Sequence, residues 1–145
     1  MISYRIEETI NRPVQEVFPY IGDPTLHAKW MDVSDMRVAT PGDVRVGSTV
    51  QGLMKVRSRM IPFAWEVTAY QEGASLAFRT TEGPMNWEGS YEVAATDGTS
   101  TRVIGSGRLS LKGWQRLLEP FMGGEVRRGE AAELRKLKDL LERPT

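Results

Sequence analysis

The sequence predicts an α+β fold in which a curved antiparallel sheet of seven strands wraps around a long C-terminal helix. Two short helical segments follow the first strand, and β-rich runs separated by turn residues fill the chain from about residue 35 to residue 111. An amphipathic segment then covers about 113–142. A sheet with one apolar face must be covered, so a single long helix that comes last indicates a sheet that grips it and leaves space between.

The first elements follow from the spacing of apolar residues. Residues 2–10 alternate apolar and polar side chains, as a half-buried strand does. The apolar set is Ile2, Tyr4, Ile6 and Ile10. Pro13 then suits the first turn of a helix that runs to Gly22, and Asp23 with Pro24 predicts the start of a second short helix that ends at Trp30.

Turn residues divide the middle of the chain into six more strands. The turns contain Pro41-Gly42-Asp43, Glu72-Gly73, Glu82-Gly83-Pro84 and Asp97-Gly98. The predicted strands cover 35–39, 47–56, 59–71, 75–81, 85–95 and 100–111. Connections this short favour antiparallel neighbours, because parallel strands need crossovers of a dozen residues or more.

The final segment carries two apolar stripes that are out of phase. The first stripe contains Trp114, Leu117, Leu118, Phe121 and Met122, and the second contains Val126, Leu134, Leu137 and Leu141. Pro120 and Gly123-Gly124 lie between them. Since proline removes a helix hydrogen bond and glycine relaxes the backbone, a helix that is kinked or divided at this point is predicted.

Composition narrows the classes of function. The 145 residues predict one domain, 1–145, and the 19 basic and 19 acidic residues cancel without a block of like charge. We therefore expect no nucleic-acid partner and no electrostatic footprint for an anionic membrane. With no cysteine, a disulfide framework and cysteine-bound metals are excluded. No apolar run suggests a signal peptide or integral membrane association, so a cytoplasmic protein is expected.

Aromatic and apolar residues on alternating strand positions and on the last helix predict a ligand pocket. The predicted ligand-binding residues are Phe63, Trp65, Val67, Phe78, Trp87, Tyr91, Leu109, Phe121, Met122, Val126 and Glu130. Each apolar member alone could simply fill the core, but together they suggest a pocket wall. Gly105 and Gly107 either leave space for a ligand or, as we favour, permit sheet curvature.

Two titratable residues admit more than one interpretation. Glu130 shares a helical face with Val126 and Leu134, and a carboxyl on that apolar stripe would have a raised pKa and could serve as a general acid or base. Alternatively, it lies at the rim and pairs with Arg127, Arg128 or an arginine of a strand. His27 is read as a surface residue, because a single histidine without a triad or ligand set has no chemistry to complete.

The order of these elements and several short segments resemble the START-like or SRPBCC superfamily, in particular its polyketide cyclase/dehydrase and lipid-transport branch. The segments are Pro13-Val14-Gln15-Glu16-Val17-Phe18, Asp23-Pro24 leading to Trp30, Val46-Gly47-Ser48, Trp65-Glu66-Val67 with Tyr70, Gly98-Thr99 with Thr101-Arg102-Val103, and Leu134-Arg135-Lys136-Leu137-Lys138. The resemblance implies a helix-grip fold with a deep pocket for a hydrophobic or amphipathic small molecule. One branch binds iron through two histidines and a carboxylate, and it is excluded because His27 is the single histidine.

Three functions from different classes remain open at this point. The first is a protein that binds a lipid, polyketide or aromatic metabolite between the sheet and the C-terminal helix, with no cofactor or metal expected. The second is an enzyme of the cyclase or dehydratase type, in which Glu130 is the candidate acid or base. The third is a protein-interaction module like the chaperone-activating relatives, which would require an exposed apolar patch.

Overall fold

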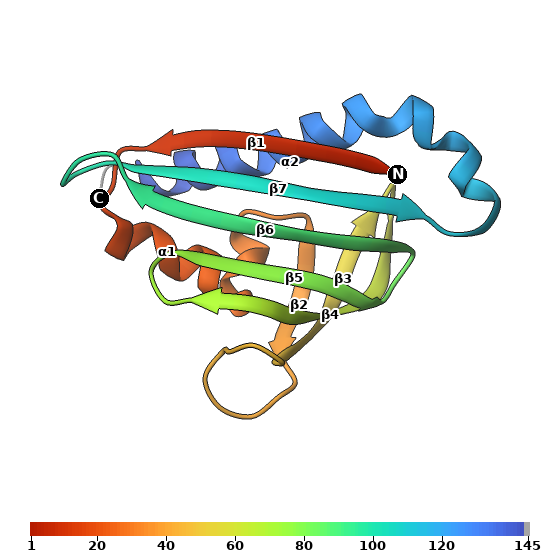
Figure 1. The fold of residues 1–145 in the computed structure, drawn as a ribbon, viewed down its shortest axis with the longest axis horizontal. Coiled ribbons are helices and arrows are strands. Elements are labelled where there is room, and N and C mark those ends of the chain that lie inside the picture. The colour runs from red at the N-terminus through yellow and green to blue at the C-terminus, as the bar shows by residue number, and fades with distance from the viewer. Residues whose placement is uncertain (144–145) are drawn as a thin grey trace.

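A computed structural model, which describes residues 1–143, contains one antiparallel sheet with a long helix lying behind one edge of it in the view of Figure 1. The strands are β1 (Ile2–Ile10), β2 (Val33–Val38), β3 (Thr49–Val56), β4 (Arg59–Gln71), β5 (Ser75–Glu82), β6 (Met85–Ala95) and β7 (Thr101–Leu111). Their order across the sheet is β1-β7-β6-β5-β4-β3-β2. The predicted seven-stranded antiparallel sheet is confirmed, and β1 pairs with β7 rather than with β2.

The segment that joins β1 to β2 crosses from one edge of the sheet to the other through α1 (Val14–Gly22) and the 3₁₀ helix η1 (Pro24–Lys29). Asp23 caps η1 as predicted, because its Oδ1 atom accepts a hydrogen bond from the backbone N–H of Thr25 at 3.0 Å. This short helix packs against β2, which brings its residues to the inner face of the sheet.

The final segment is divided, but at a different position from the one predicted. A 3₁₀ helix, η2 (Gly113–Leu118), precedes the long helix α2 (Glu119–Leu141). Pro120 lies in the first turn of α2, where a missing N–H costs nothing, and Gly123-Gly124 continue the helix. The break therefore precedes the proline instead of resulting from it.

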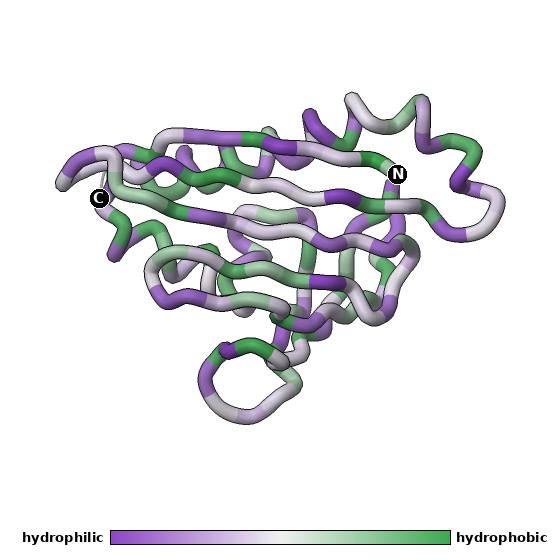
Figure 2. The backbone as a smooth tube through the Cα atoms, viewed as in Figure 1, coloured by the Kyte–Doolittle hydropathy of each residue, from purple (hydrophilic) through white to green (hydrophobic). Residues whose placement is uncertain are grey.

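The core forms where the inner face of the sheet meets α1, η1 and α2. Inward and outward side chains alternate along each strand, and Figure 2 shows the corresponding alternation of hydropathy. The side chains of Ile10, Trp30, Val103, Leu134 and Leu137 are fully buried in this layer. Because α2 contributes few core residues along its length, much of it faces solvent.

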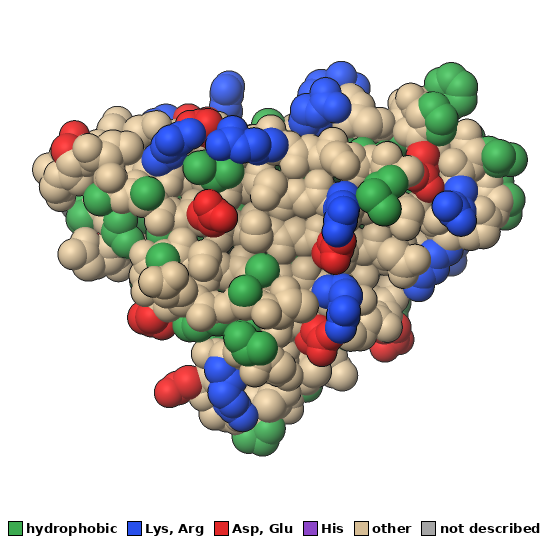
Figure 3. Space-filling model, in the orientation of Figure 1, with side chains coloured by type: hydrophobic (Ala, Val, Ile, Leu, Met, Phe, Trp, Pro, Cys, Tyr) green, Lys and Arg blue, Asp and Glu red, His purple; other side chains and the backbone are tan. Residues whose placement is uncertain are grey.

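The outer face of the sheet is polar. Arginine and glutamate side chains pair across neighbouring strands, and charged side chains are visible across this face in Figure 3. The pairs are Arg102 with Glu7, Arg108 with Glu88, and Arg79 with Glu66. Such exposed pairs contribute little to stability individually, and they leave the inner face as the side where a site can form.

Across residues 1–143, no helix combines the length and the apolar character that crossing a bilayer requires.

Candidate functional site

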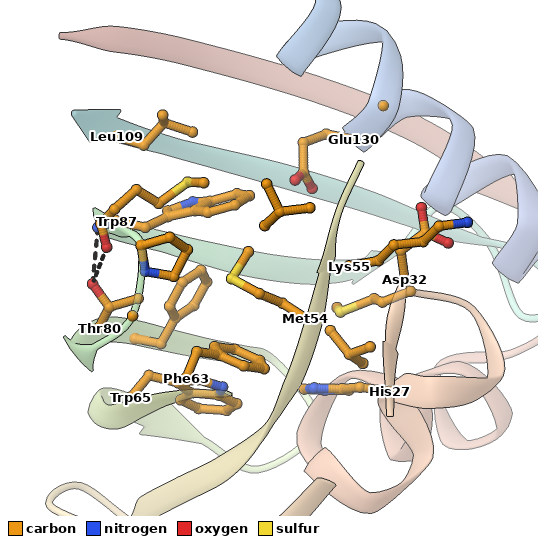
Figure 4. Close-up of a pocket in the computed structure, with 18 of the residues that line it drawn as sticks. His27, Asp32, Met54, Lys55, Phe63, Trp65, Thr80, Trp87, Leu109 and Glu130 are labelled. Carbon is orange, nitrogen blue, oxygen red and sulfur yellow. Dashed lines mark hydrogen bonds between the residues drawn. The ribbon is translucent and has the colours of Figure 1, made fainter. Parts of the chain in front are cut away.

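A cavity of about 300 Å³ lies between the sheet and α2. Figure 4 shows side chains converging on it from opposite sides, with Glu130 pointing down from α2 and Phe63 and Trp65 lying across from it. Its volume lies at the lower end of the range for small-molecule sites. The wall is mostly apolar, and Glu130 and Glu133 of α2 and Asp32 form an acidic part of it, while Thr80 and Glu82 line the cavity from β5.

Most of the predicted site residues line this cavity. They are Phe63, Trp65, Phe78, Trp87, Tyr91, Leu109, Met122, Val126 and Glu130. Two others lie outside its lining. Val67 is packed in the core, and Phe121 is 84 % exposed on the surface. The apolar stripe that contained Phe121 therefore faces solvent at this residue.

A continuous series of aromatic rings forms one wall. The ring centroids of Trp65 and Phe78 are 5.5 Å apart, and those of Phe78 and Trp87 are 6.4 Å apart. Tyr4 closes the series, because its hydroxyl accepts a hydrogen bond from the Trp87 Nε1–H at 3.0 Å. These rings present flat apolar faces, against which another ring system can pack.

His27 extends this wall, contrary to its prediction as a surface residue. Its side chain is 3 % exposed and is stacked on Trp65 with a centroid distance of 6.1 Å and an interplanar angle of 16°. The Nε2–H donates to the carbonyl oxygen of Ile21 at 2.9 Å, which leaves Nδ1 as an acceptor. Burial lowers the pKa of this imidazole, so the ring is neutral at pH 7.

Gly105 and Gly107 make room for tyrosine rings on the neighbouring strands. Gly105 pairs with Tyr91, and a Cβ atom at this position would lie 3.0 Å from that ring. Gly107 pairs with Tyr4, and a Cβ atom there would lie 2.7 Å from the tyrosine hydroxyl. The two glycines therefore position both tyrosines, a role that the sequence interpretation did not include.

Methionine is a prominent part of the lining that the sequence interpretation missed. Five of the seven methionines line the cavity. They are Met31, Met36, Met54, Met85 and Met122. Since methionine is flexible and its sulfur is polarisable, these side chains can adapt to ligands of different outline. The high number of methionines was the one sequence signal for this part of the lining. Their spacing follows neither a strand nor a helix period, so it did not indicate that they lie together.

The polar end of the cavity is centred on Glu130. Its side chain is buried, and the Tyr91 hydroxyl donates to its Oε2 atom at 3.4 Å. No arginine or lysine forms an ion pair with it within the described part of the chain, so the alternative rim position is wrong. Burial raises the pKa of Glu130 to about 7, with Asp32 adding to the effect and the hydrogen bonds from Glu133 and Tyr91 opposing it.

Glu133, which the sequence interpretation missed, completes a carboxyl pair with Glu130. It lines the same cavity, and its Oε2 atom accepts the backbone N–H of Asp32 at 2.9 Å. Burial and the neighbouring Glu130 raise the pKa of Glu133 well above its usual range, so the protonated form of Glu133 is favoured in the folded protein.

The remaining polar residues at the cavity are Lys55 and Thr80, together with Asp32 and Glu82. Lys55 is exposed and lies near Asp32 at the side of the cavity in Figure 4. Among residues 1–143, no group of three or more histidine, aspartate or glutamate side chains has the arrangement that a metal ion requires.

The model of one protein family, described as polyketide cyclase / dehydrase and lipid transport, matches residues 1–142. The chain belongs to this family. No curated protein matches the sequence. Membership of this family supports a fold that binds hydrophobic ligands.

Solved structures show the same fold at low sequence identity. The Zhui aromatase/cyclase from Streptomyces sp. R1128 aligns with a TM-score of 0.80 and 12% identity over 97% of this chain and 93% of that one. The protein TTHA0849 from Thermus thermophilus gives 0.78 and 17% over 96% of each chain. A START superfamily protein from Mycobacterium smegmatis gives 0.77 and 9% over 97% of each chain. These likenesses concern the fold alone.

Proposed function

We propose that this protein binds a small aromatic molecule that carries a hydroxyl group, with its rings against the aromatic wall and the hydroxyl at the carboxyl pair. The observation that carries the proposal is that one cavity combines an aromatic and methionine-rich wall with the buried carboxyl of Glu130 and the neighbouring Glu133. Membership of a family that includes polyketide and lipid binders supports it. The proposed ligand class includes lipids and polyketides that carry both a ring system and a hydroxyl group.

The apolar wall supplies the affinity. Each roughly 100 Å² of apolar ligand surface removed from water contributes about 2.5 kcal/mol before the costs of ordering are subtracted. Ring systems also gain from contact with the edges and faces of Phe78, Trp65 and Trp87. A flat polycyclic molecule therefore fits this wall better than a branched one of equal area.

The carboxyl pair supplies the selection for a hydroxyl group. When Glu130 is ionised it is a buried acceptor, and its hydrogen bond from Tyr91 is long at 3.4 Å. A ligand hydroxyl that donates to this carboxylate forms a charge-assisted hydrogen bond, which stabilises the complex by about 1.5–3 kcal/mol. A methyl group at the same place would leave the carboxylate unpaired.

Displacement of a fluorescent probe tests this proposal. N-phenyl-1-naphthylamine, whose emission rises in apolar surroundings, is bound to the protein and displaced with 2-naphthol or 2-methylnaphthalene. We expect 2-naphthol to bind about tenfold more tightly at pH 8, and we expect Glu130→Gln to reduce this preference. Failure of the probe to bind, or equal affinity for the two compounds, would contradict the proposal.

Two glycines of α2 offer a matched pair of variants for that experiment. Gly129 lines the cavity, and a Cβ atom there would meet nothing within 4 Å, so Gly129→Phe can project into the open space. Gly124 is exposed on the same helix and does not line the cavity. We expect Gly129→Phe to abolish probe binding and Gly124→Phe to leave it unchanged.

A second candidate function is catalysis of a cyclisation or dehydration, and the raised pKa values of two carboxyl groups that line one cavity favour it. Glu130 can remove a proton from a carbon beside a carbonyl group, while Glu133 can protonate a departing hydroxyl to release water. The fold shared with an aromatase/cyclase is consistent with this chemistry. With a poly-β-ketone thioester as substrate, Glu130→Gln is expected to lower kcat at least a hundredfold. Unchanged turnover would refute catalysis and leave the binding proposal standing.

A further inference from the structure

An exposed apolar surface lies at the junction of η2 and α2. Seven large hydrophobic side chains are exposed among residues 1–143, and four of them lie between residues 114 and 121. Trp114 is 72 % exposed, Leu117 77 %, Leu118 38 % and Phe121 84 %. These four residues are called the 114–121 patch. Figure 3 shows hydrophobic side chains gathered at the end of the molecule where η2 projects past the sheet in Figure 1.

The patch is held in place at its base. The carboxylate of Glu119, which is buried, accepts a hydrogen bond from the backbone N–H of Leu111 at 3.2 Å, which closes the excursion of η2 away from the sheet. On the other side, the Lys112 Nζ atom donates to the carbonyl oxygen of Gly83 at 2.8 Å. The exposed apolar side chains therefore project from an anchored segment, which distinguishes the patch from a frayed helix end.

The patch is continuous with one end of the cavity. Leu111 is the last residue of β7 before the segment that carries the patch, and Met122 follows Phe121, the last residue of the patch. Both side chains line the cavity. Gly83 and Pro84 line the same end. A surface that engages the patch would therefore lie against the end of the cavity that is bounded by these residues.

The charges around the patch are mainly positive. Lys112 and Arg116 are exposed, and Glu119, the one acid between residues 112 and 124, is buried and forms ion pairs with the N-terminal amine and, at 4.0 Å, with Arg116. Arg128 lies seven residues after Phe121, on the same helical face, and its guanidinium extends back toward Gly124. Glu125 is the nearest exposed acid along the chain and Glu82 precedes Gly83, so the segment from Lys112 to Arg128, in which Arg127 is also exposed, carries more exposed cations than exposed acids.

We propose that the 114–121 patch docks on the surface of a lipid bilayer that contains anionic headgroups. Tryptophan, leucine and phenylalanine insert among headgroups and upper acyl chains, and flanking arginine and lysine contact lipid phosphates. The four side chains are exposed at the end of the molecule that projects past the sheet, where they can insert into a deformable bilayer without a complementary pocket. Docking brings the cavity end near Leu111 and Met122 to the membrane, where an apolar ligand can enter from the lipid phase.

Sedimentation with vesicles tests the proposal. Vesicles of phosphatidylcholine, with or without phosphatidylglycerol, are incubated with the protein and with variants at exposed positions. We expect the wild type to bind the mixed vesicles and Trp114→Ser/Phe121→Ser to lower the partition coefficient at least tenfold. The double variant Arg116→Gln/Arg128→Gln should lower the partition coefficient about fivefold for each cation removed, and only on vesicles that contain phosphatidylglycerol. The control is Val46→Ser, which removes a side chain that is 61 % exposed in the loop between β2 and β3 and should change nothing.

The fluorescence of Trp114 reports the docking directly, because this side chain lies outside the cavity. On binding, its emission should shift to the blue and be quenched by lipids brominated in the upper acyl chain. Absence of vesicle binding by the wild type, or equal binding by the wild type and Trp114→Ser/Phe121→Ser, would overturn the proposal. Self-association of the wild type without vesicle binding, lost in the same variant, would also overturn it and assign the patch to a second copy of the chain.

Discussion

Glu130 is expected to make the protein less stable as the pH rises from 5 to 8. Burial raises the pKa of this carboxyl from 4.5 to about 7, because the ionised form is poorly solvated in the folded state. At about 1.4 kcal/mol per pH unit, the difference corresponds to about 3 kcal/mol in the free energy of unfolding. The contribution is fully present below pH 4.5 and is lost as the pH rises through 7. Glu130→Gln stays neutral, so it should lack this loss.

Urea unfolding at pH 5, 6, 7 and 8, followed by circular dichroism, measures the effect as the difference between the wild type and Glu130→Gln. The difference is required because His27 acts in the opposite direction. Its lowered pKa favours the neutral ring in the folded state, so its contribution is present above pH 6.5 and is lost as the pH falls. The exposed acid Glu125 provides the control variant, Glu125→Gln. A wild-type-minus-Glu130→Gln difference that does not vary with pH would refute the reasoning.

Three further substitutions, one of them with an exposed control, test the packing and the cap of η1. Gly107→Ala places a Cβ atom 2.7 Å from the Tyr4 hydroxyl, so chemical denaturation should show a loss of about 1–3 kcal/mol; an unchanged midpoint would contradict the close packing. Leu134→Ala creates a cavity at a fully buried position and should cost about 2–5 kcal/mol, whereas Leu117→Ala, at a position that is 77 % exposed, should stay within about 0.5 kcal/mol in the same assay. Asp23→Ala removes the side-chain acceptor at the start of η1 and should lower thermal stability by an amount equivalent to about 1 kcal/mol; wild-type stability would argue against the cap.

The sheet could be predicted from the sequence because its signals are local. Alternation of apolar and polar residues sets the two faces of each strand, and turn residues such as Gly73 and Gly83 mark the ends. Both of these glycines have positive φ angles, 75° and 144°, which other residues rarely adopt. The order of short connections then fixes the antiparallel meander, and most predicted strands begin or end within two residues of the observed ones.

The acidic end of the cavity could be predicted only in part. The helical phase correctly placed Glu130 on the apolar face of α2, but the choice between burial and the rim depends on which strand residues lie opposite. Glu133 lies three positions further along the helix. The backbone N–H that donates to its carboxylate belongs to Asp32, which is distant in the sequence. The burial of His27 has the same origin, because stacking on Trp65 depends on the docking of η1 against the sheet.

The 114–121 patch shows that a helical stripe of apolar residues does not by itself predict burial. The spacing predicts which side chains share a helical face, but not whether another element covers that face. Here the first stripe falls partly in η2, whose 3₁₀ geometry has three residues per turn and therefore changes the phase. Trp114 and Phe121 consequently face solvent, while Met122 turns toward the cavity. Exposure is decided by where the segment leaves the sheet.

Native mass spectrometry of the purified protein, beside the same sample after denaturing extraction, tests the binding of a hydrophobic molecule most directly. We expect a stoichiometric adduct that denaturation releases, with the mass of an aromatic or lipid-like compound that carries a hydroxyl group. The Gly129→Phe variant, purified in the same way, should lack the adduct, because its new side chain projects from a residue that lines the cavity. An identical adduct on both proteins would contradict binding in this cavity.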